Sequence, residues 1–272
     1  MRDIFIKLFS YISGLIVIAI MLFIFIYIFL KGYKVIDIEF LFSIPKGMPL
    51  GESGGIFPAI IGSLYLGILS SLISSVLSIL TAMYLCFYCR NKKIYNLIKF
   101  SIQSISGLPS IVIGLFGYSF CIMKLGIPKS LLSAGITLSI MIIPYITLRV
   151  EKIFNEFSKN ILEASLSLGV SKVYSIRKIV LPNCKVKILQ SISLSVAYAM
   201  GATAPIMFTG AVIFANSPRS IKDPFMALPY HLYILISEGY SINMAYGTAF
   251  VLMIIIFVIN LSCYFSDRRE KL

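Results

Sequence analysis

Polar and charged residues recur at fixed spacing in the stretch 149–187 of an otherwise apolar chain. The stretch contains Glu163-Ala164-Ser165, then Gly169 after three residues, and Ile179-Val180-Leu181-Pro182 after nine more. Because the stretch is amphipathic and its surroundings are apolar, it should lie in water at a membrane surface and offer helices for docking to a partner. It predicts a helix, a turn at Gly169 and a second helix, whose corner fits a groove on another protein.

Two amphipathic helices should position this corner. On a helical wheel of 152–168 the apolar side chains fall on one face and the Lys and Glu side chains on the opposite face. The predicted buried stripe is Ile153, Phe157, Ile161, Ala164 and Leu168. Ser171 is expected to cap the second helix, Val173, Ile176 and Val180 to share one side of it, and Pro182 to end it. The alternative is a pair of helices that lie flat on lipid headgroups.

The spacing resembles the EAA loop of the membrane subunits of ABC importers, whose pattern is E-A-A, three residues, G, nine residues, I-x-L-P. The chain matches it at Glu163, Ala164, Gly169, Ile179, Leu181 and Pro182, and has Ser165 in place of the second alanine. The resemblance implies that these residues dock on an ATP-hydrolysing subunit and transmit its closure to the membrane helices. Glu163 and Gly169 are the residues expected to transmit that force.

The rest of the chain is typical of a membrane protein. Hydrophobic residues make up 58%, charged residues only 13%, and the mean hydropathy is +0.94. Uncharged runs predict an all-α domain over 1–272 with six spans. The expected spans are 8–30, 58–87, 100–123, 130–148, 188–216 and 240–266, with the docking loop at 149–187.

Most of the Lys and Arg residues lie on the side of the docking loop if the N-terminus is on that side too. The positive-inside rule then predicts a multi-pass protein of the plasma (inner) membrane with both termini and the loop in the cytoplasm. The net charge of +13 is accounted for by contact with anionic membrane lipid, so no nucleic acid is needed as a partner.

Two glycine- and proline-containing motifs are expected to break helices inside the membrane. They are Gly107-Leu108-Pro109-Ser110 and Gly201-Ala202-Thr203-Ala204-Pro205. A stripe of small residues in the second span, Ser63, Gly67, Ser70, Ser71, Ser74 and Ser78, favours helix packing over a solute path. The single histidine, His231, and the five cysteines are interpreted as structural, with no metal site.

Four ordered segments look like the A-type permease subunit of the bacterial phosphate importer: 54–62, 107–115, 201–210 and 223–229. Position 202 is Ala where the common family form, G-E-T-A-P, has Glu. The resemblance implies a type I ABC importer permease that carries inorganic phosphate inward. Its partners would be a related permease, two cytoplasmic ATPase subunits and an extracytoplasmic phosphate-binding protein.

The expected translocation path contains Pro109, Ser110, Thr203, Pro205 and Arg219. No G-x-x-x-x-G-K-[ST] phosphate-binding loop occurs, so the chain is not expected to be an enzyme or to hold a cofactor, and ATP would be bound by the partner. Another oxyanion, such as sulfate or molybdate, remains an alternative cargo. A stand-alone gradient-driven transporter or channel predicts intramembrane carboxylates or an inverted repeat, and a membrane enzyme needs polar catalytic residues in the spans.

Overall fold

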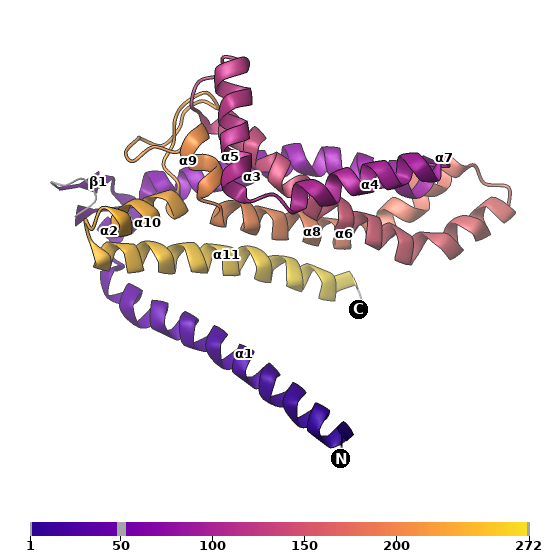
Figure 1. The fold of residues 1–272 in the computed structure, drawn as a ribbon, viewed down its shortest axis with the longest axis horizontal. Coiled ribbons are helices and arrows are strands. Elements are labelled where there is room, and N and C mark those ends of the chain that lie inside the picture. Colours follow the sequence, from indigo (N-terminus) through magenta and orange to yellow (C-terminus); the bar gives the residue numbers. More distant parts are fainter. Residues whose placement is uncertain (1, 48–52, 271–272) are drawn as a thin grey trace.

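The computed structural model describes the backbone of residues 2–47 and 53–270, and nearly all of it is helical (Figure 1). One short antiparallel pair, with Pro45 opposite Gly54 and Lys46 opposite Ser53, departs from an all-helical fold. In chain order the elements are α1 (Arg2–Gly32), the 3₁₀ turn η1 (Tyr33–Val35), α2 (Ile38–Phe42), β1 (Pro45–Lys46), β2 (Ser53–Gly54), α3 (Phe57–Met83), the π-helical turn η2 (Tyr84–Tyr88), α4 (Lys92–Ser106), α5 (Ser110–Gly117), the π-helical turn η3 (Tyr118–Lys124), α6 (Leu131–Ser167), α7 (Lys172–Ser175), the π-helical turn η4 (Ile176–Val180), α8 (Leu181–Gly201), α9 (Ala204–Thr209), α10 (Leu228–Ser237) and α11 (Ile242–Glu270).

Helices α3, α6 and α8 form the central bundle, and its core is closely packed because α3 presents small side chains. The hydroxyls on this face are buried and satisfied within the protein: Ser70 Oγ donates to Leu66 O (2.7 Å), and Ser78 Oγ donates across to Ile143 O of α6 (3.1 Å). Gly67 lies against Met200 of α8. The packing interpretation of the small-residue stripe is confirmed.

Both motifs expected to break helices do so. Between α4 and α5 the chain bends by 100° at residues 107–109, and Figure 1 shows α5 standing across the direction of α4. Proline explains the break, because it disfavours the helical conformation of Leu108 before it. In the second motif α8 ends at Gly201, Ala202 is extended and α9 starts at Ala204, with Pro205 in its first turn.

Among the described residues, four helical segments are long and apolar enough to cross a membrane: Ile6–Val35, Phe57–Tyr88, Leu131–Glu156 and Ile242–Cys263. The bent pair Lys92–Ser106 and Ser110–Lys124 makes a fifth if it counts as one span. The count of six is not confirmed. Within the expected range 188–216, α8 stops at Gly201 because the second motif interrupts it.

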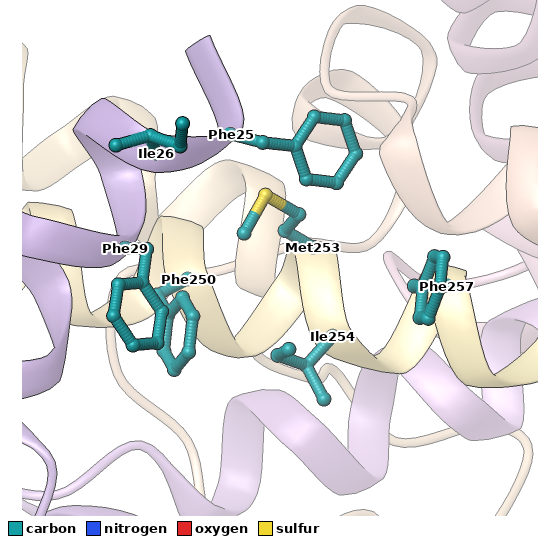
Figure 2. Close-up of a pocket in the computed structure, with 7 residues that line it drawn as sticks. All are labelled: Phe25, Ile26, Phe29, Phe250, Met253, Ile254 and Phe257. Carbon is teal, nitrogen blue, oxygen red and sulfur yellow. The ribbon is translucent and has the colours of Figure 1, made fainter. Parts of the chain in front are cut away.

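Helix α1 diverges from the bundle toward its N-terminal end, and both α1 and α11 run between the β1 end and the end where α7 lies (Figure 1). Near its C-terminal end α1 meets α11, where Phe29 and Phe250 pack edge to face (5.4 Å between centroids). Figure 2 shows the wholly apolar pocket of about 300 Å³ between them, lined by Phe25, Ile26, Phe29, Phe250, Met253, Ile254 and Phe257. Apart from this contact, nearly all of the described α1 side chains, from Ile6 onward, are exposed.

Candidate functional site

The docking loop folds as a helix, a tight turn and a helix. The turn is a Schellman motif, in which Gly169 N–H donates to Leu166 O (3.0 Å) and Val170 N–H donates to Ser165 O (3.1 Å). Gly169 has φ +78°, the left-handed conformation that favours glycine. The predicted turn at Gly169 is confirmed, and it brings the end of α6 beside α7.

Side chains fix α7 to both neighbouring helices. Ser165 Oγ lies 2.8 Å from Ser175 Oγ, and both residues are buried. Lys172 donates a hydrogen bond to Phe87 O at the end of η2, and its Nζ lies 5.2 Å from the centroid of the Tyr88 ring. A cation beside the carbonyl end of a helix is favourable, so α7 is attached to α3 as well as to α6.

The predicted buried faces are wrong at three positions. In the stripe of the first helix, Leu168 is 83% exposed and Ala164 is also exposed; in the second helix Val173 is 64% exposed, whereas Ile176 and Val180 are buried. Helix α6 ends at Ser167, so the turn carries Leu168 away from the face that Ile153 and Phe154 bury in the core. Phe157 lies outside the described side chains. Leu166, Leu168, Val173 and Tyr174 are the exposed large apolar residues of the corner, and we refer to them as the apolar patch.

Pro182 does not end the second helix, contrary to the prediction. It lies in the first turn of α8, which continues to Gly201 after the π-helical turn η4. Proline fits there because it lacks an N–H at the point where the backbone hydrogen bonds change from the π-helical to the α-helical pattern. Asn183 Nδ2 donates to Ile179 O (2.7 Å). Ser171 occupies the predicted N-cap of α7, but its side chain makes no capping hydrogen bond.

The structure places the motif residues of the loop in three environments. Glu163, Ala164, Gly169 and Pro182 are exposed, Ile179 and Leu181 are half-buried, and Ser165 is buried. The corner therefore exposes a carboxylate, that of Glu163, as well as the apolar patch. An exposed apolar surface with a charged edge is typical of a protein–protein contact.

The two helix breaks meet at one cavity of about 510 Å³. Its lining residues are Ser110, Met141, Ala197, Tyr198, Gly201, Ala202, Thr203, Ala204 and Pro205, and none of them is charged. The breaks are held together because Gly114 of α5 lies so close to α9 that an added Cβ would be 2.8 Å from Ala204 O. Hydroxyls from Ser110, Tyr198 and Thr203 therefore converge on a space wide enough for a small solute.

Three of the five expected path residues line this cavity, and Pro109 adjoins it as the N-cap of α5. Arg219 does not belong to it. Arg219 lines a separate pocket of about 210 Å³ with Tyr65 and Leu131, in a loop that Asp223 braces by accepting hydrogen bonds from the N–H groups of Arg219 (3.0 Å) and Ser220 (2.8 Å).

Sequence reasoning missed Tyr198 and a buried ionic cluster beside the loop. Tyr198 lines the cavity and stacks on Tyr145 with an interplanar angle of 12°. In the cluster, Glu151 of α6 accepts hydrogen bonds from Lys99 and Tyr95 of α4. The one available signal was that Lys99 and Glu151 flank expected spans on the same side of the membrane.

The docking loop and the cavity together lead to a comparison with known proteins. Residues 74–271 match the family model described as binding-protein-dependent transport system inner membrane component. The chain belongs to this family. The chain is similar to a probable phosphate transport system permease protein PstA of Methanocaldococcus jannaschii, 30% identical over 76% of this chain and 74% of that one. A probable ABC transporter permease protein YqgI of Bacillus subtilis is 27% identical over 91% of this chain and 88% of that one.

Solved structures give the same fold. The permease chain of an inward-facing MetNI methionine ABC transporter superposes with a TM-score of 0.66 at 17% identity, covering 78% of this chain and 94% of that one. A chain of an amino acid ABC transporter gives a TM-score of 0.56 at 20% identity, with 80% and 93% covered. The architecture is therefore that of an ABC importer permease, a membrane subunit of a transporter.

Proposed function

We propose that this chain is the membrane subunit of an ATP-driven importer that moves inorganic phosphate into the cell. The proposal rests on one observation. Helices that form the docking loop continue to the cavity, where the two broken helices meet. Helix α8 begins in the loop at Leu181 and ends at the cavity with Gly201. A displacement of the loop is thereby converted into a displacement of one cavity wall.

The chemistry of the cavity suits an anion that has already been selected elsewhere. Ser110, Tyr198 and Thr203 supply hydroxyl donors. Helix α5 starts at the cavity, and the N-terminal end of a helix stabilises anions because its first N–H groups are unpaired. Hydroxyls and amides can donate hydrogen bonds to phosphate oxygens without the ion pair to a Lys or Arg side chain that would retain the ion. Similarity to phosphate transport system permeases PstA, such as that of Mycobacterium bovis at 29% identity, supports phosphate as the cargo.

The proposed assembly contains a related permease, two cytoplasmic ATPase subunits and an extracytoplasmic phosphate-binding protein. The corner residues Glu163, Ala164, Ser165, Gly169, Ile179, Leu181 and Pro182 would form or support the ATPase contact. ATP would be bound and hydrolysed by that partner, with no catalytic residue or cofactor in this chain. The exposed surface of α1 supports a place for a second permease or lipid against this helix.

The proposed arrangement in the inner membrane has six spans, with 149–187 and both termini in the cytoplasm. It is supported by the positive-inside distribution and by the way α1 and α11 run toward the end where α7 lies (Figure 1). In this arrangement α8 with its continuation is the span expected at 188–216, which completes the count of six. Pro109, Ser110, Thr203 and Pro205 line or adjoin the path, and Arg219 belongs to its outer mouth.

The test is reconstitution of the complete complex in liposomes, with the external binding protein supplied and ATP inside. We expect phosphate to stimulate ATP hydrolysis and to accumulate, while sulfate and molybdate do neither. Stimulation by sulfate or molybdate alone would identify that anion as the cargo and leave the proposed mechanism unchanged. Uptake that proceeds without ATP, driven by an ion gradient, would refute the importer mechanism itself.

A further inference from the structure

A buried ionic cluster joins α4 to α6 next to the docking loop. Glu151 Oε1 of α6 lies 3.0 Å from Lys99 Nζ and 2.5 Å from Tyr95 Oη, both on α4. The Glu151 side chain is 5% exposed and that of Lys99 is 35% exposed. A carboxylate so deeply buried requires these partners, because an unpaired buried charge is strongly destabilising. We refer to Glu151, Lys99 and Tyr95 as the Glu151 cluster.

Helix α4 has few other attachments to the protein. Its only buried side chain is that of Ile102, and the remaining side chains of this helix are half-buried or exposed. Packing of one apolar residue leaves a helix free to slide or tilt, since apolar contacts are not directional. The hydrogen bonds of the Glu151 cluster are directional, so they determine where α4 lies along α6.

The two sides of the α4–α5 bend are attached to different parts of the molecule. Below the bend, α4 is held by Glu151 to α6, whose C-terminal end forms the docking loop. Above the bend, α5 is held to α9 by the close approach of Gly114 to Ala204 and Pro205, and to the N-terminal half of α6 by that of Gly117 to Thr137. The bend lies between these attachments, and Ser110, which lines the cavity, follows it directly.

We infer that Glu151 is a positioning residue that couples the docking loop to the cavity, by making α4 follow the half of α6 next to the loop while α5 stays with α9 and the N-terminal half of α6. A tilt of α6 then changes the angle at residues 107–109 and moves Ser110 relative to Thr203. This inference rests on the proposed importer function. It adds a second connection from loop to cavity, independent of the direct one through α8.

The complete reconstituted complex tests the inference with Glu151→Gln, which keeps the shape and removes the charge. Phosphate imported per ATP hydrolysed should fall by about fivefold or more, the lower range of measured coupling between sites, while the ATPase subunits still bind and hydrolyse ATP. The exposed pair Lys46–Glu39 outside the docking loop (3.1 Å) provides the matched control, so Glu39→Gln should change nothing. The charge-swapped double variant Glu151→Lys with Lys99→Glu should restore import.

A Glu151→Gln complex that imports as much phosphate per ATP as the unaltered protein would overturn the inference. If that variant fails to assemble, the double variant Glu151→Gln with Lys99→Met is used instead, because it removes both charges together and leaves no buried charge unpaired. Unchanged coupling in this double variant would overturn the inference equally. A general loss of folding, which the charge-swapped variant does not repair, would also count against a positioning role.

A second readout separates this inference from the identity of the cargo. Spin labels on the exposed residues Ser104 of α4 and Leu115 of α5, in a chain without its native cysteines, report the distance across the bend in the complex. Addition of ATP and vanadate should change that distance in the otherwise unaltered chain and leave it nearly fixed with Glu151→Gln. An equal change in both refutes the coupling role, whereas absence of phosphate uptake by the unaltered complex refutes the cargo alone.

Discussion

Replacement of Gly169 by alanine isolates the contribution of the loop corner to docking. Gly169 occupies the left-handed position of the Schellman motif with φ +78°, and a Cβ added there would meet no atom within 4 Å. Steric clash with neighbours therefore contributes nothing. The cost is that of a left-handed backbone for an L-residue, about 1–2 kcal/mol. Such an energy lowers the population of the correctly folded corner by a factor of about 5 to 30 relative to alternatives.

The apparent affinity for the ATPase subunits should fall with that population, because only the folded corner presents Leu168 and Val173 together. We expect Gly169→Ala to raise the dissociation constant by up to about the same factor. Gly169→Asn is the matched control, since asparagine tolerates the left-handed conformation and adds a larger side chain to the same open space. It should bind more tightly than Gly169→Ala.

The measurement is titration of purified ATPase subunits onto the permease complex in lipid nanodiscs, with ATP hydrolysis rates recorded at saturation. If both variants bind as tightly as the glycine protein, the left-handed turn is not required for docking. If asparagine is as damaging as alanine or worse, the side chain itself obstructs the contact and the backbone argument fails. Saturating ATPase should restore hydrolysis with Gly169→Ala, because the substitution changes the population and not the contact surface.

Two further predictions concern buried polar groups. Ser165→Ala removes the hydrogen bond to Ser175 and should destabilise the corner by about 1 kcal/mol, measured as faster hydrogen exchange of the Val170 amide. In a Ser175→Ala background, Ser165→Ala should have no additional effect on this exchange. A full additional effect would contradict the role of the hydrogen bond. Burial lowers the pKa of His231, on α10 outside the expected spans, from 6.5 to about 4. Above pH 6.5 this histidine is neutral in both the folded and the unfolded chain. As the pH falls from 6.5 toward 4, the unfolded chain binds a proton and the folded chain does not, so the free energy of unfolding falls by about 3 kcal/mol. His231→Asn should show a smaller loss of thermal stability over that pH range, and an equal loss would contradict the burial argument.

Local sequence signals predicted the parts of the site that depend on local chemistry. The turn at Gly169 followed from glycine after an apolar helical pattern, and the breaks after Gly107 and Gly201 followed from proline in apolar runs. That both breaks meet at one cavity was implied by resemblance and by their position, whereas the contact itself depends on Gly114 lying against α9. No rule about residue spacing in the sequence predicts the contact between Gly114 and α9.

The errors arose where a helical wheel was extended past the end of its helix. Leu168 fits the apolar stripe of α6 by periodicity, but the helix stops one residue earlier and exposes it. Pro182 resembles a stop signal, yet the preceding π-helical turn lets the helix continue through it. The Glu151 cluster depends on the placement of α4 against α6, which tertiary packing decides.

The absence of charge from the cavity lining is compatible with phosphate transport because a path and a receptor have opposite requirements. A guanidinium or ammonium group in a low-dielectric cavity would hold a phosphate ion by charge-assisted hydrogen bonds and slow its release. Ser110, Tyr198 and Thr203 offer neutral donors, and Ala202 adds no carboxylate that would repel the ion. Selection must then occur before the ion reaches the cavity. In the proposed importer an external binding protein meets that requirement, and movement of α8 together with a change of the α4–α5 angle would release the ion inward.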